Sequence, residues 1–222
     1  MKKIMFNDKY GLTQAVLEGR KTNSRRAERS LDVLPLCYNP LINEFQFEYK
    51  DDIIVVRRLF KGTHVQTYHL KPRYKISEEV AVAQKYKDCG WNPDVLQETF
   101  VKKPTVFPDL DPISTHLGWV DLPFKYHKGW TNKMFVLADL MPNRIRITNI
   151  KVERLQDISD EDCQKEGVVA THGGYGVEFD LNYQVFGSTP SEAFASLIDR
   201  ISGKGTWECN PWVFAYEFEL IK

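Results

Sequence analysis

A lysine, a serine and a glutamate are the residues of this chain whose types could together perform chemistry. Lys21 and Ser24 lie in one basic segment, residues 19–26, and Glu166 lies in a distant acidic segment, residues 155–167. A lysine whose pKa is lowered by burial can act as a base toward a hydroxyl, and a carboxylate can orient that lysine or pass a proton to a leaving amine. The same groups could instead line a polar cleft for a nucleobase and its phosphates, so acyl transfer and ligand binding both stay open.

Strand geometry limits how Lys21 and Ser24 can meet. Residues 21–26 are predicted to be extended, and side chains three positions apart on a strand point to opposite faces. The two groups therefore meet only where a turn or a bulge intervenes. The plain structural alternative is a solvated lysine after a helix, a surface serine, and a glutamate at a helix C-terminus.

The lysine belongs to a dense basic cluster, whose members are Arg20, Lys21, Arg25, Arg26 and Arg29. Arginine forks in such a cluster can contact phosphate oxygens and position a nucleic-acid backbone. Ordinary salt bridges explain the cluster equally well, and Arg26 could be the buried partner of a carboxylate. The residues that we predict to bind a ligand are Arg20, Thr22, Arg25 and Arg26.

Composition limits the classes of partner. The chain has 222 residues, 42% of them hydrophobic, with 30 basic and 30 acidic side chains. Proteins that grip long duplexes are usually strongly basic, so any RNA contact should be local. No apolar run is long enough for a membrane span or a signal peptide. The cysteines and histidines lack metal-ligand or disulfide spacing, which predicts a cytoplasmic protein with no metal, no cofactor and no membrane contact.

Short elements must position the candidate residues in the first part of the chain. Residues 3–6 are predicted to be a strand, and a helix containing Leu12, Ala15 and Val16 should end at Gly19 in a left-handed cap. Residues 45–49 and 53–60 predict a hairpin, to which residues 64–70 could add a third strand. Residues 80–84 predict a small apolar strand.

The second part of the chain has clearer signals. Alternation over residues 144–155 predicts a strand, and its change of phase near Asn149 predicts a bulge. Ser159 should begin a helix that ends near Gly167, and Thr189 should begin one that Gly203 closes. Residues 212–221 predict a half-buried central strand, and the glycine-rich residues 171–176 predict a mobile loop.

These elements do not alternate as βαβ units, which favours an α+β fold: a compact mixed β-barrel with peripheral helices. No linker separates two domains, so residues 1–222 are predicted to form a single domain. Residues 86–133 have poor periodicity, with Trp91, Trp119 and Trp130 among prolines. They predict a long insertion in which the tryptophans serve packing rather than base stacking.

The order of five segments resembles the ASCH (activating-signal-cointegrator homology) family of the PUA-like superfamily, and its longer bacterial and phage members above all. The segments are residues 19–26, 74–84, 141–147, 152–167 and 210–218, and the first contains the core G-x-K-T-x-[ST]-x-R. Relative to compact members, residues 31–73 and 86–133 are large insertions. The resemblance implies a PUA-like barrel whose cleft faces RNA, a nucleotide or a related small molecule.

One compact branch of that family acts as an amidohydrolase on N4-acetylcytidine through a lysine, a threonine and a glutamate. Its motifs match Lys21, Ser24 and Glu166, with serine in place of threonine. Our main prediction is a protein that binds RNA or a nucleoside-like ligand at these residues. The first alternative is an amidohydrolase that deacylates a modified nucleobase with Lys21, Ser24 and Glu166 as its catalytic residues. The second is a non-catalytic interaction module with a vestigial cleft, in which Lys21 would splay away from Glu166.

Overall fold

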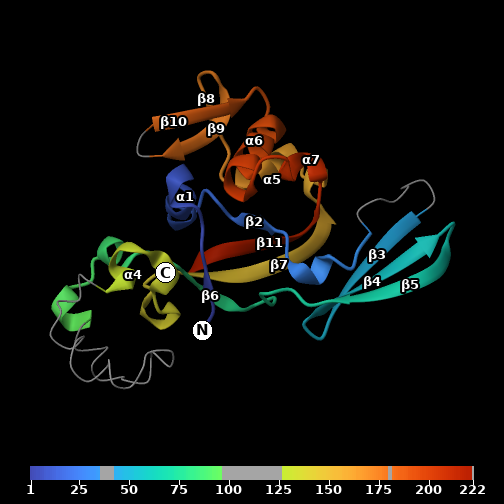
Figure 1. Cartoon of the computed structure of the whole chain (residues 1–222), viewed down its shortest axis with the longest axis horizontal. Coiled ribbons are helices and arrows are strands. Elements are labelled where there is room, and N and C mark those ends of the chain that lie inside the picture. The colour runs from blue at the N-terminus through green and yellow to red at the C-terminus, as the bar shows by residue number, and fades with distance from the viewer. Residues whose placement is uncertain (36–42, 97–126, 180–181, 222) are drawn as a thin grey trace. The chain divides into compact units, whose positions relative to one another are not determined.

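The structure is a computed structural model that describes residues 1–35, 43–96, 127–179 and 182–221 (Figure 1). The chain divides into two compact units. One contains Met1–Phe6 and Ala81–Asn143, and the other contains Asn7–Val80 and Arg144–Lys222. Every residue predicted to act as a catalytic or binding group belongs to the second unit, so its sheets and helices determine the site.

The central sheet of the second unit contains β7 (Arg144–Arg154), β11 (Trp212–Ile221) and β2 (Asn23–Arg26). β11 lies in the middle and pairs antiparallel with both neighbours, as predicted for a central strand (Figure 1). The expectation that β11 is half-buried is wrong at its start, because residues from Trp212 to Tyr216 are buried on both faces. The alternating aromatic residues of β11 predicted burial of one face only, because the residues between them are the small side chains Val213 and Ala215.

A bulge interrupts β7, as its change of phase predicted. Glu217 of β11 pairs with Asn149, and the next residue, Phe218, pairs with Ile147. Thr148 is therefore the extra residue on β7. The bulge lets Ile147 and Ile150 both be buried although they are three positions apart.

The helices of the second unit are short except for one. They are η1 (Asp8–Tyr10), α1 (Leu12–Leu17), η2 (Arg29–Leu31), η8 (Leu155–Asp157), α5 (Asp160–Lys165), α6 (Pro190–Ser202) and α7 (Thr206–Cys209). The predicted caps are confirmed: the Ser159 side chain accepts a hydrogen bond from the Asp162 N–H, and the Thr189 side chain accepts one from the Glu192 N–H. These caps satisfy amide donors that the first turn of each helix leaves unpaired.

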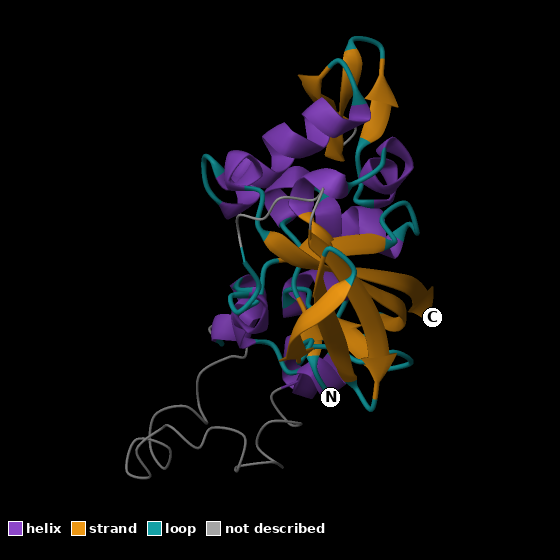
Figure 2. Cartoon of the chain, turned by 90° about the vertical axis from the view of Figure 1, so that its right-hand side faces the viewer, coloured by secondary structure: helices purple, strands orange, loops and turns teal. Residues whose placement is uncertain are grey.

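Two further antiparallel sheets complete the second unit (Figure 2). One contains β3 (Asn43–Lys50), β4 (Ile53–Phe60) and β5 (Thr63–Leu70), which confirms the predicted hairpin and its third strand. The other contains β8 (Val169–Thr171), β9 (Gly174–Phe179) and β10 (Asn182–Gly187). The loop predicted at residues 171–176 is wrong: these residues form the β8–β9 turn and the start of β9, and Thr171 pairs with Gly174. Here the glycines supply turn geometry, with φ of 134° at Gly174.

The first unit is built around a short parallel pair, β1 (Lys3–Ile4) and β6 (Glu79–Val82), joined through Lys3–Ala81 and Ile4–Val82. Its remaining described elements are η3 (Tyr86–Cys89), α4 (Lys128–Thr131), η6 (Lys133–Phe135) and η7 (Ala138–Leu140). Trp91 and Trp130 pack against its apolar core, as expected for structural tryptophans, whereas Trp119 lies outside the described residues.

The α+β class predicted from the sequence is confirmed. The strands that the structure describes form several separate sheets and do not close into a barrel. In the same described ranges, no helix has the length and apolar character needed to cross a membrane.

Candidate functional site

Two helix ends fix the backbone around Lys21. Gly19 follows α1 with φ of 75°, the left-handed conformation predicted for this cap. The Lys21 N–H then donates to the Ala15 carbonyl at 3.0 Å, and the Thr22 N–H donates to the Lys165 carbonyl at 2.9 Å. Residues 21 and 22 are thus held between the end of α1 and the end of α5 before the chain enters β2.

Lys21 and Glu166 form a buried ion pair. Lys21 Nζ lies 2.5 Å from Glu166 Oε2 and also donates to the Glu166 backbone carbonyl at 2.8 Å. The lysine is only 3% exposed and the glutamate only 5%. Glu166 follows the last residue of α5, so its carbonyl is one of the groups that a helix C-terminus leaves unpaired. The lysine therefore binds the side chain and the backbone of the same residue.

Arg25 anchors Glu166 from a second direction. Its guanidinium contacts three carboxylates: Nε lies 2.6 Å from Glu153 Oε1, Nη2 lies 2.8 Å from Asp162 Oδ2, and Nη1 lies 3.2 Å from Glu166 Oε1. The Arg25 side chain is 1% exposed. Each oxygen of Glu166 thus meets a different cation. We call Lys21, Arg25, Glu153, Asp162 and Glu166 the buried ionic network.

Burial and charge act in opposite directions on these groups. Burial lowers the pKa of Lys21, and the attraction of Glu166 offsets only part of that effect. For Glu166, burial alone would raise the pKa, but Lys21 and Arg25 together hold it below its ordinary value. Burial raises the pKa of Glu153, and Arg25 only partly opposes this rise. Glu166 is therefore held ionised, beside a lysine that gives up its proton more readily than usual.

Gly167 allows Lys21 to approach the end of α5. Its φ is 101°, a conformation that glycine adopts and other residues rarely do. A Cβ atom at this position would lie 3.2 Å from Leu12 Cδ2 and 3.7 Å from both Cβ and Cδ of Lys21. The stem of the lysine therefore crosses directly over this glycine to reach Glu166.

Ser24 and Arg26 lie on the other face of β2. Arg25 points toward Glu166, and alternation along β2 turns the side chains at positions 24 and 26 to the opposite face. There Ser24 pairs directly with Tyr216, and Arg26 pairs with Phe214. β2 pairs regularly with β11, so Ser24 shares a strand face with Arg26 and not with Arg25. The structure brings Lys21 and Glu166 into contact.

The other predicted ligand-binding residues lie at the margin. Arg20 is partly exposed and is held by Glu18, at 2.5 Å from Nη2, and by Glu178, at 3.6 Å. Thr22 is partly buried, and both its N–H and its carbonyl take part in backbone hydrogen bonds. Arg25 has its three nitrogens turned to carboxylates, so its guanidinium is not presented to a ligand.

Sequence reasoning missed the partners of Arg25. Two signals could have found them. Alternation in β7 buries Ile150 and Val152 on one face and so turns Glu153 to the face of Arg25. Asp162 and Glu166 are four positions apart on a helix, so they share one side of it.

The charged groups of the network pair with one another. Within the described residues, no group of three or more histidines, cysteines or carboxylates could hold a metal ion. The three carboxylates instead surround a guanidinium. Comparison of the chain with protein-family models, with curated proteins and with solved structures found no match.

Proposed function

We propose that this chain is a PUA-like protein of the ASCH type, which binds RNA or a nucleoside-like ligand beside Lys21 and Glu166. One observation carries the proposal: Lys21 Nζ lies 2.5 Å from Glu166 Oε2, although the two residues are 145 positions apart. The resemblance to the ASCH family singled out this pair among the 30 basic and 30 acidic residues of the chain. Their contact supports the same arrangement in space.

The cost of the pair also favours a functional site. Taking a lysine and a carboxylate out of water costs several kcal/mol for each ion, and apolar residues of the same size are often at least as stable. Groups with perturbed pKa values concentrate at functional sites for this reason. The hypothesis of a vestigial cleft expects Lys21 to splay away from Glu166, and the contact weighs against it.

A second candidate, an amidohydrolase, is supported by the lowered pKa of Lys21. A lysine base must lose its proton near neutral pH, and burial acts in that direction. Ser24 lies on the face of β2 opposite to Arg25, the strand residue that contacts Glu166. The nucleophile in this mechanism would therefore be a water molecule rather than the serine hydroxyl. Lys21 would accept the proton of that water, and Glu166 would keep the lysine in position.

Ligand titration tests the main proposal. Cytidine, N4-acetylcytidine and a short single-stranded RNA are titrated by calorimetry into the wild type, Lys21→Met and Glu166→Gln. We expect binding to be lost in both variants. Lys151→Met is the matched control, because Lys151 also lies 2.5 Å from a glutamate, Glu217, but is about half exposed. Equal binding by the wild type and Lys21→Met would contradict the proposal.

Acetate release separates the two candidates. The wild type and Lys21→Met are incubated with N4-acetylcytidine, and acetate is measured over time. Turnover that is lost in Lys21→Met and kept in Ser24→Ala would support hydrolysis through a water molecule. Binding without turnover would leave the ligand-binding function alone.

A further inference from the structure

Arg154, the last residue of β7, is a buried arginine that lacks a carboxylate partner. It is 9% exposed, and its Nη1 is buried without a hydrogen-bond partner. Within the described ranges its guanidinium takes part in no ion pair and in no hydrogen bond. Its Cζ lies 5.4 Å from the centroid of the Trp212 ring. Buried charges are normally paired, because taking an ion out of water is costly, so stability alone does not account for this arginine.

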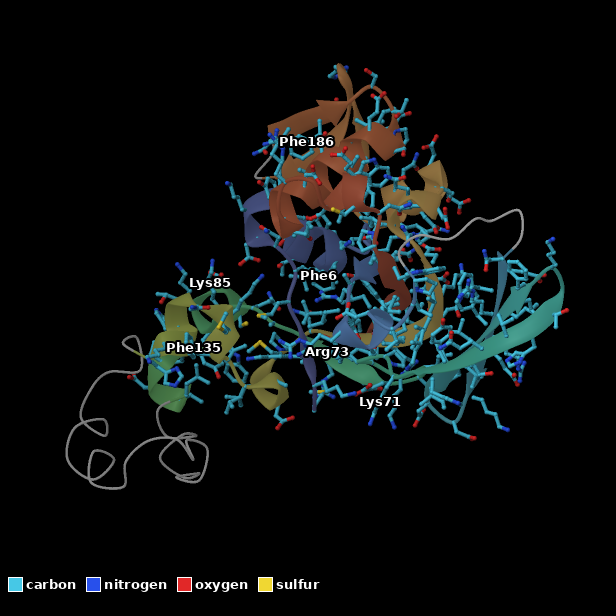
Figure 3. All side chains as sticks on the ribbon, turned by 45° about the vertical axis from the view of Figure 1, so that its right-hand side comes forward. Phe6, Lys71, Arg73, Lys85, Phe135 and Phe186 are labelled. Carbon is cyan, nitrogen blue, oxygen red and sulfur yellow. The ribbon has the colours of Figure 1, made fainter. Side chains whose placement is uncertain are left out.

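Other arginines of the same unit show what Arg154 lacks. Arg25 is buried to a similar degree, but three carboxylates surround it. Arg200 also lies over an aromatic ring, with its Cζ 4.7 Å from the centroid of Phe186, which Figure 3 labels. Arg200 is exposed, however, and so remains hydrated. Arg154 has neither the carboxylates of Arg25 nor the hydration of Arg200.

The open edge of the Arg154 guanidinium is the one that can hold two oxygens. Nη1 is the only one of its three nitrogens that is fully buried without a hydrogen bond. Nε and Nη2 have no hydrogen-bond partner in the described part of the chain either, so they keep contact with the surface. These two nitrogens carry parallel N–H groups, which match the spacing of two oxygens in a carboxylate or a phosphate.

Trp212 keeps the Arg154 guanidinium in one plane. The indole Nε1 of Trp212 donates to the Pro35 carbonyl at 2.9 Å, and the Phe45 ring packs against the indole with 5.3 Å between centroids. A guanidinium stacked on a fixed ring loses little side-chain freedom when it binds a ligand. The open edge is therefore preorganised.

We infer that the Nε and Nη2 edge of Arg154 binds an oxyanion, which is a carboxylate or a phosphate group of a small ligand. The oxyanion accepts both N–H groups and supplies the negative charge that Arg154 lacks among the described residues. Glu153 contacts Arg25, and the next residue of β7 faces the opposite side of the sheet. The site is therefore separate from the buried ionic network and goes beyond the proposed function, so Lys21→Met should leave oxyanion binding unchanged.

Titration followed by nitrogen-edited NMR tests the inference. Sodium acetate and sodium phosphate are added separately to the full chain at constant ionic strength, with sodium chloride as the reference salt. We expect the Nε–H resonance of Arg154 and the indole N–H resonance of Trp212 to shift saturably with at least one oxyanion and not with chloride. The anion that binds more tightly identifies the ligand group as a carboxylate or a phosphate.

Two lysine variants show whether the paired N–H groups bind the anion. Arg154→Lys keeps the charge but removes the fork, so the Kd read from the Trp212 indole resonance should rise roughly tenfold. Arg146→Lys is the matched control, because Arg146 lies on the same strand, is 43% exposed and already pairs with Glu79 and Glu219. It should leave the Kd unchanged. No saturable shift with either oxyanion, an equal shift with chloride, or an equal Kd in Arg154→Lys would overturn the inference.

The stability of Arg154→Met separates a ligand site from a structural one. Removing a buried charge that has no carboxylate partner should change the midpoint of urea unfolding little. Arg25→Met removes the centre of three ion pairs and should lower the midpoint clearly. A fall in Arg154→Met as large as that in Arg25→Met would assign Arg154 to the fold and would count against the ligand site.

Discussion

Removing both partners of the Lys21–Glu166 pair should destabilise the protein by less than the two single removals added together. Lys21→Met keeps an unbranched stem over Gly167 but leaves the carboxylate of Glu166 with Arg25 as its remaining cationic partner in the network. Glu166→Gln leaves the buried ammonium of Lys21 beside the backbone carbonyl of residue 166. The double variant has neither charge, so its loss should be smaller than the sum of the two single losses.

The magnitude follows from burial. Breaking a buried ion pair by removing one partner costs about 3–5 kcal/mol, because the other charge stays buried without compensation. Lys21→Met should lie at the low end of that range, since Arg25 still contacts Glu166 Oε1 at 3.2 Å. The double variant should cost about as much as one single variant. The coupling energy of the cycle is then at least about 2 kcal/mol.

Urea unfolding measures the four free energies of unfolding, and a second cycle supplies the control. Lys151→Met and Glu217→Gln break a pair of the same length, 2.5 Å, in the same unit, but Lys151 is about half exposed. Exposed pairs contribute under about 1 kcal/mol, so the control coupling should stay below that value. A coupling energy for Lys21 and Glu166 no larger than the control value would refute the argument that burial makes this pair strong.

Three further predictions concern the surroundings of the pair. Gly167→Ala should lower the free energy of unfolding by about 1–3 kcal/mol, because residue 167 has a positive φ and the added Cβ atom would press on Leu12. Gly203→Ala is the control, since Gly203 has a similar φ but open space around it. In a thermal unfolding experiment, Gly203→Ala should lower the free energy of unfolding by less than Gly167→Ala does. Stability should fall as pH drops below about 4.5, because the folded-state pKa of Glu166 lies below its unfolded value, and Glu166→Gln should flatten that part of a pH series of urea titrations. Ser159→Ala should cost about 1 kcal/mol in urea unfolding, since the serine caps α5, and an unchanged midpoint would contradict this.

Most elements around the site could be predicted from local sequence. The start of α5 at Ser159, the end of α1 at Gly19 and the bulge in β7 follow from capping and periodicity, which act over a few residues. The contact of Lys21 with Glu166 joins segments far apart in the chain. No pattern within either segment predicts this contact, and we expected it only from the resemblance to a family.

The role of Arg25 could not be predicted from the sequence of β2 alone, because it depends on which face of the strand meets α5. Arg25 and Arg26 are adjacent and chemically identical, and the sequence does not distinguish which of them meets the carboxylates of α5. Strand alternation gives the two residues opposite faces, but only the packed structure says which face α5 covers.

If the chain binds a nucleotide as we propose, the charge of the network determines which part of that nucleotide would meet it. Two cations, Lys21 and Arg25, face three carboxylates, Glu153, Asp162 and Glu166, so the five groups together are negative when all are ionised. A phosphate would be repelled there, whereas the neutral edge of a base can exchange hydrogen bonds with Lys21 and Glu166. Cytidine should therefore bind the wild type at least as tightly as cytidine 5′-monophosphate in a calorimetric titration at low salt. Tighter binding of the monophosphate, by about tenfold or more, would mean that the phosphate sets the affinity from a different basic surface and that the network is structural.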